Sequence, residues 1–494
     1  MTRLALRHAV RRIAPLAWPV FVGQVAVLAF STIDTVMVAR TTATDLAALA
    51  VGAAVYISVF VGLMGIVLAI GPIAGQLFGA GKPRECGEEV QQAMWLALFL
   101  ALPGCLLLLA PEPFLALSQA EPAVAGKVRG YLGGLAFALP PALVFTAYRG
   151  FNVAISRPKA VMAIQTAGLA VKVPLNALFV FGLALPTPLG ELRLPALGVG
   201  GCALATSIVM WCQLGAGAWL LRRDPFYERF GLGRGIELSP PRAASLGALL
   251  RLGVPIGLAV LVEVTGFTFM AFFVSRIGAT AVAGHQIAAN MASMMFMLPL
   301  AIANAASTLV AQQIGAGDPL DARRIGWAGL ELGIAVAAVL GATVYLLRGH
   351  VVGLYTANPV IVAAALPLLV WVGLFHVADA AQTIAAFVLR AYRIATMPLV
   401  VYVVAVWGIG LGGGYVAAFD LLGISPAWMQ GARGFWAMAT VGLTTAGLAM
   451  TALLAGKLRT QVRTTPQGSG REGSNPERSS SRWAAGARDG DPGP

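Results

Sequence analysis

The sequence predicts an all-α integral membrane protein, with twelve transmembrane helices in two six-helix lobes. Three observations support this prediction: the composition, the lengths of the apolar segments and an internal repeat. Apolar residues make up 58% of the 494-residue chain and charged residues only 11%, with a mean hydropathy of +0.80. Soluble proteins carry about 25% charged residues. Most of this chain must therefore face lipid or another apolar helix.

Twelve segments of the chain are nearly free of charge and long enough to cross a bilayer. A transmembrane helix needs about 20 apolar residues. The segments expected to span are 13–39, 46–71, 88–110, 131–150, 160–182, 196–221, 252–276, 281–308, 324–347, 361–389, 397–419 and 434–457. Strands are not expected, because a membrane β-barrel shows segments of about ten residues with alternating hydropathy.

The chain contains one long stretch twice, with a constant offset. Residues 252–319 match residues 16–83, so that LGVP aligns with LAWP and GAGDP aligns with GAGKP. Further along the two halves, Arg390 matches Arg149. Six spans therefore follow six, and because six is even, both halves enter the membrane in the same direction. The expected pseudo-twofold axis runs along the membrane normal, as in transporters whose substrate path lies between two parallel repeats.

Lysine and arginine are distributed unevenly along the chain. With a cytoplasmic N-terminus, 26 of the 34 basic residues fall on the cytoplasmic side and seven on the outer side, and Lys172 lies inside a span. Cytoplasmic loops are enriched in basic residues, so both termini are expected to be cytoplasmic. The expected parts are an N-terminal lobe (13–221), a cytoplasmic linker (222–251), a C-terminal lobe (252–457) and a disordered cytoplasmic tail (459–494), which has almost nothing apolar to bury.

Composition and motifs also exclude several classes of function. The formal net charge of +13 suggests nucleic-acid binding, but the basic residues lie in loops rather than on a soluble face. The four cysteines have no spacing typical of a zinc site or a disulfide framework. Nucleotide-binding and hydrolase motifs are missing from the sequence. We therefore expect no nucleic-acid partner, no cofactor and no enzymatic activity.

Glu263 and Asp379 are the acidic residues expected near mid-membrane in the C-terminal lobe. Glu263 follows Arg251, and Asp379 precedes Arg390, by about three helical turns in each case. With both arginines at the cytoplasmic edge, the two carboxylates lie at similar depth. Na+ and H+ both relieve the repulsion between two acids in a low dielectric, so the pair is predicted to share a cation. The alternative is that each acid is separately protonated or hydrogen-bonded to a neighbouring helix.

Asp34 and Lys172 are the ionisable residues expected inside the N-terminal lobe. Asp34 lies in the outer half of the first span, and Lys172 is followed one turn later by Asn176. Ionisable groups in spans are functional candidates by default. A buried ammonium within about 4–6 Å favours an ionised carboxylate, so Lys172 is predicted to be a built-in counter-ion for Asp34. The alternatives are a carboxylate that pairs near the outer surface and a lysine that extends to water.

Seven stretches resemble the multidrug and toxic compound extrusion (MATE) family, and within it the NorM-like bacterial branch. They are IDTVMVAR around Asp34, QLFGAGKP, VKVPLN, LGVGGCALAT, LVEVTGF around Glu263, VAGHQIAAN, and ADAAQTIAAFVLRAYR around Asp379. The resemblance spans residues 13 to about 457. It implies a twelve-helix, two-lobe fold and the export of lipophilic organic cations in exchange for Na+ or H+.

The resemblance also implies roles for single residues. It makes Asp34, Glu263 and Asp379 the cation-coupling acids, with Na+ able to bind at Glu263 and Asp379. The other candidates to line the cation site are Asn290, Phe375, His376, Lys172 and Asn176. Two departures matter: Phe375 stands where relatives often have tyrosine, and Lys172 and Asn176 stand where archaeal relatives have asparagine and aspartate. The second departure argues against an Na+ site in the N-terminal lobe.

These observations predict a monomeric antiporter of a bacterial inner membrane that exports amphipathic organic cations. One alternative is a flippase for a lipid-linked precursor, which should carry several basic residues in its cavity, where the sequence offers only Lys172. Another is an intramembrane enzyme with Glu263 and Asp379 as a dyad, which would not need a full-length repeat. The residues do not name the drug, choose between Na+ and H+, or fix the stoichiometry.

Overall fold

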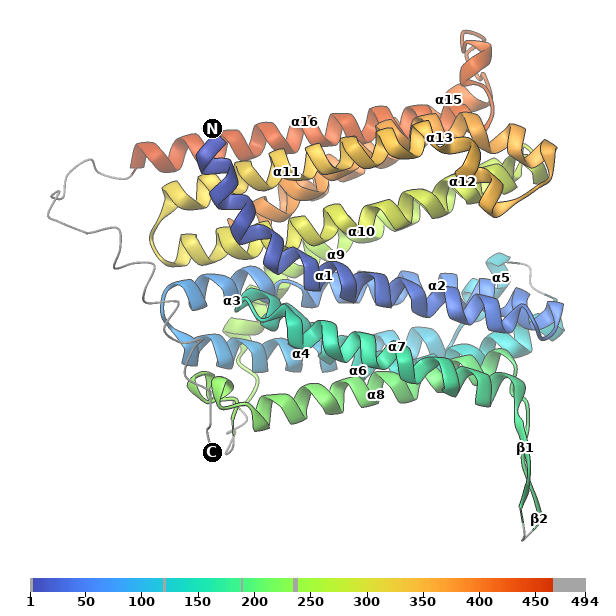
Figure 1. The fold of residues 1–494 in the computed structure, drawn as a ribbon, viewed down its shortest axis with the longest axis horizontal. Coiled ribbons are helices and arrows are strands. Elements are labelled where there is room, and N and C mark those ends of the chain that lie inside the picture. Colours follow the sequence, from blue (N-terminus) through green and yellow to red (C-terminus); the bar gives the residue numbers. More distant parts are fainter. Residues whose placement is uncertain (1–2, 119–120, 188–189, 234–238, 465–494) are drawn as a thin grey trace, which may run out of the picture. The chain divides into compact units, whose positions relative to one another are not determined.

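The computed structural model describes residues 3–118, 121–187, 190–233 and 239–464, and these are almost entirely helical (Figure 1). Twelve helices in the described part of the chain are long and apolar enough to cross a membrane. The predicted fold class is thus confirmed. Five of these helices (α4, α6, α7, α11 and α13) have proline in their first turn, where the missing N–H costs no hydrogen bond and the fixed φ suits the helix.

The spans of the two halves follow one plan. In the N-terminal half they are α1 (Arg3–Val38), α2 (Ala43–Val67) with α3 (Ile70–Gly79), α4 (Pro83–Leu109), α6 (Pro122–Ala154), α7 (Pro158–Phe181) and α8 (Val199–Arg223). In the C-terminal half they are α9 (Ala243–Ser275), α10 (Ala279–Gly315), α11 (Pro319–Leu346), α13 (Pro359–Ala391), α14 (Thr396–Tyr402) with η2 (Val403–Gly412) and α15 (Gly413–Ala418), and α16 (Ala432–Thr464). The short helices are α5 (Glu112–Ser118), α12 (Arg348–Tyr355), η1 (Pro225–Phe230) and η3 (Ala427–Met429). The helices α5 and α12 occupy the same place in the two halves.

Two spans depart from a single regular helix. The second span is interrupted between α2 and α3, at Leu68 and Ala69. The eleventh span contains η2, a π-helix of ten residues, and π-helical turns are rare and often lie at functional sites. Trp407 of this π-helix donates from Nε1 to the Val262 carbonyl of α9, at 3.0 Å. The irregular segment is therefore held against the helix that carries Glu263.

A β-hairpin, which the sequence analysis did not expect, lies between α7 and α8. Strand β1 (Leu183–Thr187) pairs antiparallel with β2 (Gly190–Leu194), and Leu183 lies opposite Leu194. The hairpin extends beyond the helix ends (Figure 1). The argument against strands concerned the membrane spans, and the described spans are indeed helical. That argument gave no information on the loop between α7 and α8.

Each half sends the first turns of its first span to the other half. Arg12 of α1 binds Asp321 of α11 at 2.6 Å, and Figure 1 shows the start of α1 crossing to α10 and α11. In the same way, Leu249 and Leu252 of α9 belong to the apolar core of the N-terminal half. The exchange begins inside the segment 222–251, predicted as a linker, because α9 already starts at Ala243.

The two halves also lock together at the ends of α3 and α10, on the predicted cytoplasmic side. Gln76 donates from Nε2 to the carbonyl of Ala391, the last residue of α13, at 2.7 Å. Gln312 donates in return to the carbonyl of Ala154, the last residue of α6, also at 2.7 Å. These two hydrogen bonds, which we call the glutamine latch, each satisfy a helix-end carbonyl of the opposite half.

The end of the chain differs in one detail from the prediction. Helix α16 continues through Thr464, so the first residues of the predicted tail 459–494 are helical. The prediction of disorder for the remainder, residues 465–494, lies outside the described residues.

Candidate functional site

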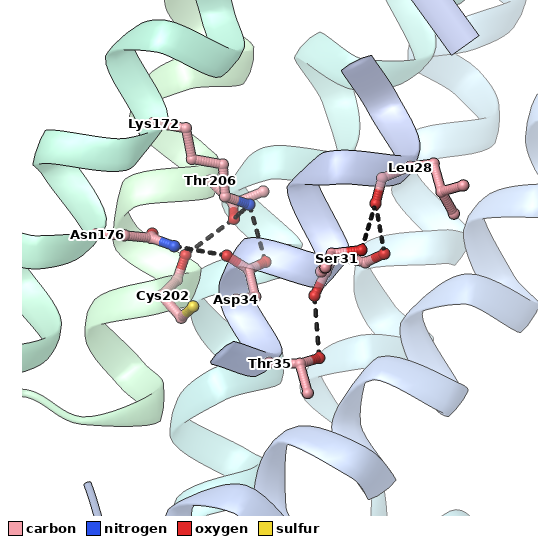
Figure 2. Close-up of polar contacts among 9 residues, drawn as sticks. Leu28, Ser31, Asp34, Thr35, Lys172, Asn176, Cys202 and Thr206 are labelled. Carbon is pink, nitrogen blue, oxygen red and sulfur yellow. Dashed lines mark hydrogen bonds and ion pairs between the residues drawn. The ribbon is translucent and has the colours of Figure 1, made fainter. Parts of the chain in front are cut away.

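Asp34 and Lys172 meet in the interior of the N-terminal half. Lys172 Nζ lies 2.8 Å from Asp34 Oδ2, and the lysine exposes only 1% of its surface. Asn176 donates from Nδ2 to the other carboxylate oxygen of Asp34 at 2.6 Å. Lys172 and Asn176 are one turn apart on α7 and therefore share a face. Figure 2 shows both side chains converging on Asp34 of α1.

Helix α8 completes the surroundings of this ion pair. Lys172 also donates to Thr206 Oγ1 at 2.9 Å, and the Thr206 hydroxyl donates a hydrogen bond to the Cys202 carbonyl (Figure 2). The ammonium lies 4.8 Å from the centre of the Phe30 ring, which adds a cation–π attraction. Charge, hydrogen bonds and ring contact together compensate the cost of removing the ammonium from water.

Glu263 and Asp379 lie near each other in the C-terminal half, on α9 and α13. They are close enough to interact electrostatically, although no hydrogen bond joins them. Asp379 is buried and accepts a hydrogen bond from Gln382 Nε2 at 2.9 Å. Glu263 interacts electrostatically with Arg390, and Tyr402 of α14 lies within range of all three charges. The buried Gln382 Oε1 has no hydrogen-bond partner among the described residues.

The remaining candidates are Phe375, His376 and Asn290, and they differ in burial and in whether they share a pocket with Glu263. Phe375 lines a small pocket together with Glu263 and packs edge-on against Phe267. His376 is buried, and its Nε2 has no hydrogen-bond partner in the described part of the chain. Asn290 is exposed and accepts from the Tyr355 hydroxyl at 2.7 Å. Asn290 thus lies on neither of the two pockets that Glu263 lines.

A cavity of about 550 Å³ lies between the two halves. Asp34 and Lys172 line it from the N-terminal half, and Glu263 lines it from the C-terminal half. Asp379 and Asn176 stand behind this wall, since they are not among the lining residues. The aromatic residues that line the cavity are Phe30, Tyr56, Phe60, Tyr131, Phe145, Phe296, Phe387 and Tyr402. Such a wall suits flat, lipophilic molecules, and rings also attract cations.

Sequence reasoning missed two cavity residues that carry charge. Arg149 of α6 and Arg390 of α13 both line the cavity, whereas the sequence analysis counted both among the basic residues of the cytoplasmic side. The repeat already paired these two arginines, and two matched positions that keep the same charge could have marked them as candidates. The expectation that Lys172 is the sole basic residue in the cavity was therefore wrong.

The MatE family model matches residues 19–178 and residues 255–416 of this chain. The two matched segments cover more than half of the chain and start one repeat apart. The chain belongs to the MatE family. As its relatives also indicate, it is a NorM-like MATE transporter, and the same family model matches both of its halves.

Named relatives of this MATE transporter are similar over most of its length. The "Probable multidrug resistance protein NorM" of Aromatoleum aromaticum is 39% identical over 425 residues, which cover 86% of this chain and 89% of the relative. "Multidrug resistance protein PmpM" of Pseudomonas aeruginosa is 32% identical over 464 residues, covering 93% and 94% of the two chains.

Solved MATE transporters share the fold. The Vibrio cholerae MATE transporter VcmN in its bent form has a TM-score of 0.79 at 16% identity, and the match covers 93% of this chain and 99% of VcmN. The eukaryotic MATE transporter AtDTX14 has a TM-score of 0.78 at 18% identity, with coverage of 93% and 100%. At these identities the likeness concerns the fold alone.

Proposed function

We propose that this MATE transporter is a secondary antiporter that exports amphipathic organic cations in exchange for Na+ or H+. The observation that carries the proposal is the aromatic cavity between the halves, which has Asp34 on one wall and Glu263 on the other. A lipophilic cation gains from the rings and from Glu263, whereas Asp34 already has Lys172 as its counter-ion. The names of the relatives, which are multidrug resistance proteins, support the same function.

In this proposal the coupling ion binds at Glu263 and Asp379. Their interaction provides two negative charges in a poorly solvated place, where either a proton or a cation relieves the repulsion. The unpartnered Gln382 Oε1 beside Asp379 supplies a further oxygen. Hard cations bind oxygen ligands, so the set fits Na+ as well as H+. The ion is cargo, and the protein needs no resident cofactor.

In the N-terminal half, Lys172 takes the place of a coupling cation. Its ammonium already lies 2.8 Å from Asp34, so Asp34 is neutralised from within the protein. The two halves then have unequal roles, with the ion bound in the C-terminal half. The proposal also includes a monomer in the inner membrane. Both termini lie in the cytoplasm in this proposal, as the distribution of basic residues predicts.

Two arginines in the cavity bear on the flippase alternative. Its main counterargument was the lack of basic residues in the cavity, and Arg149 and Arg390 remove that argument. The multidrug names of the relatives still favour drug export. The intramembrane-enzyme alternative gains no observation from the structure.

Transport in proteoliposomes tests the function. We expect a fluorescent lipophilic cation to accumulate against its gradient only when an Na+ or H+ gradient is imposed, with Na+, pH and membrane potential varied one at a time. Accumulation without any ion gradient would contradict the antiport mechanism. Movement of a fluorescent lipid between leaflets, with no movement of the cation, would favour the flippase.

A further inference from the structure

The charged residues that line the central cavity do not balance. Its acids are Asp34 and Glu263, and its bases are Lys172, Arg149 and Arg390. Lys172 forms an ion pair with Asp34, and Arg390 interacts electrostatically with Glu263. One cation, Arg149, is left over.

Arg149 has no carboxylate partner among the described residues. Its one recorded polar contact there is from Nη2 to Met64 Sδ, at 3.5 Å, and a thioether sulfur is a weak acceptor. A guanidinium carries five donors in a fixed planar fork. A cation in an apolar, partly enclosed place is costly unless it is paired. Arg149 therefore offers unused donors to whatever enters the cavity.

The internal repeat relates Arg149 to Arg390, which has Glu263 within electrostatic range. Arg149 and Arg390 are matched positions of the two halves, and so are Val27 and Glu263, which lie in the first span of each half. All four residues line the cavity. The C-terminal half thus lines the cavity with an acid as well as its arginine, whereas the N-terminal half has valine in the place that corresponds to Glu263.

We propose that Arg149 is the group that binds a carboxylate on the transported molecule, and that it decides whether the cavity distinguishes a free carboxylate from its ester. The fork of Arg149 matches the two carboxylate oxygens, while the aromatic wall holds the ring system. This inference rests on the proposed export function, because it assigns a specificity-determining residue to the same cavity.

The test uses a matched pair of dyes: a rhodamine with a free benzoate, and its methyl ester, which lacks the carboxylate. Binding to the purified full-length protein is measured alongside transport in proteoliposomes. We expect Arg149→Gln to weaken binding of the free benzoate dye by about 10- to 100-fold, the usual range for a lost charge-assisted hydrogen bond. Binding of the ester should stay within about twofold. Arg149→Lys, which keeps the charge without the fork, should give an intermediate loss.

Val27→Glu is the second variant, and it leaves Arg149 unchanged. It introduces into the N-terminal half the acid that Glu263 provides in the other half, so it should weaken binding of the benzoate dye and spare the ester. Arg129→Gln, on the same helix as Arg149 but exposed beside Glu112, is the control and should change neither dye.

Each outcome decides the inference. Equal losses for both dyes, or no loss for either, would overturn it, because Arg149 would then act on packing or not at all. Competition by phosphatidylglycerol that disappears in Arg149→Gln, without discrimination between the dyes, would assign the site to a lipid phosphate and also overturn it. If the wild type binds the benzoate dye through Arg149 but transports neither dye, the export function fails while the carboxylate site stands.

Discussion

Lys172 is the residue whose chemistry most distinguishes the two halves. Its ammonium contacts Asp34, Thr206 and the Phe30 ring, which leaves no room for a second cation between lysine and carboxylate. Removing one partner of a buried ion pair typically costs about 3–5 kcal/mol, because the other charge stays buried alone. A protein without this lysine must therefore recruit another cation to Asp34.

We predict that Lys172→Asn makes export depend on a cation at Asp34. A proton or Na+ would take the place of the ammonium, so export should become more sensitive to pH and should acquire or strengthen an Na+ requirement. The measurement is the transport rate in proteoliposomes over a pH series, with and without Na+. The control is Lys159→Asn, an exposed lysine on the same helix. A Lys172→Asn protein with the parent's pH profile and ion requirement would refute the role of Lys172 as counter-ion.

We predict that Glu263→Gln and Asp379→Asn each abolish coupled export in a folded protein. Each amide keeps the size of the side chain but cannot exchange a proton or neutralise Na+. Concentrative uptake should fall to the level of empty liposomes, while thermal unfolding in detergent stays close to that of the parent. Glu331→Gln, an exposed acid of α11, should transport normally. Normal coupling in either of the first two variants would remove that residue from the coupling site.

The sequence predicted part of this residue-level arrangement. The contact between Lys172 and Asp34 followed from both residues being costly in a membrane, so that each needed the other. Asn290 lies away from the acids, and nothing in its local sequence indicated that Tyr355 would bind it. The sequence analysis placed Arg149 and Arg390 by counting residues from the end of a span, which gives only the depth of a residue in the membrane. It could not show that the cavity between the halves extends to that depth.

Helix packing at the element scale depends on glycines where the halves cross. A Cβ on Gly79 would lie 1.9 Å from the Gln312 carbonyl oxygen, and a Cβ on Gly315 would lie 1.9 Å from the Gln76 carbonyl oxygen. Small residues let helix backbones approach in this way. The repeated GAG motif therefore encodes the contact between α3 and α10.

We predict that Gly79→Ala forces these two helices apart. Overpacking costs about 1–3 kcal/mol, and here the obstacle is backbone, which cannot rotate away. The melting temperature in detergent should fall, and reagents should reach the cavity more easily from the α3 side. The control is Gly71→Ala in the same helix, where an added Cβ meets nothing within 4 Å. An unchanged melting temperature in Gly79→Ala would show that the crossing is less tight than described.

Local sequence could not predict the irregular elements. The π-helix η2 lies in the glycine-rich stretch VVAVWGIGLG, whose apolar pattern equally suits an α-helix. Its anchor, the bond from Trp407 to Val262, joins segments far apart in sequence. The twelve spans, in contrast, were predictable, because length and hydropathy alone decide whether a helix can cross a bilayer.

At the scale of the whole molecule, the repeat produces matched contacts between the halves. Each half inserts the first turns of its first span into the other, and each contributes one glutamine to the latch. Both kinds of contact lie on the predicted cytoplasmic side. A transporter that alternates between two openings must break such contacts to open on that side, so their strength helps set the balance between the two states.

The tail from residue 465 onward is predicted to be dispensable. Its sequence has little apolar surface to bury, and its arginines at most interact with anionic headgroups. Deleting residues 465–494 should leave transport per molecule unchanged, as measured in proteoliposomes against the full chain. A truncated protein that is expressed normally but transports poorly would reveal a function in the tail.

The glutamine latch gives a prediction for the alternation itself. In Gln76→Ala/Gln312→Ala, two buried carbonyls at helix ends lose their donors across the halves. Each such hydrogen bond contributes about 1 kcal/mol, so the equilibrium should shift roughly 30-fold toward the state that is open on the predicted cytoplasmic side. Thr44 and Thr280 are matched positions at the starts of α2 and α10, far from the latch. The distance between spin labels at these two positions should then become shorter. Gln430→Ala removes a comparable bond to a carbonyl, at Ser425, within one loop, and should leave the distances unchanged. If the double variant keeps the parent's distance distribution, the latch does not set the balance, and the exchanged first turns of α1 and α9 become the contacts to test.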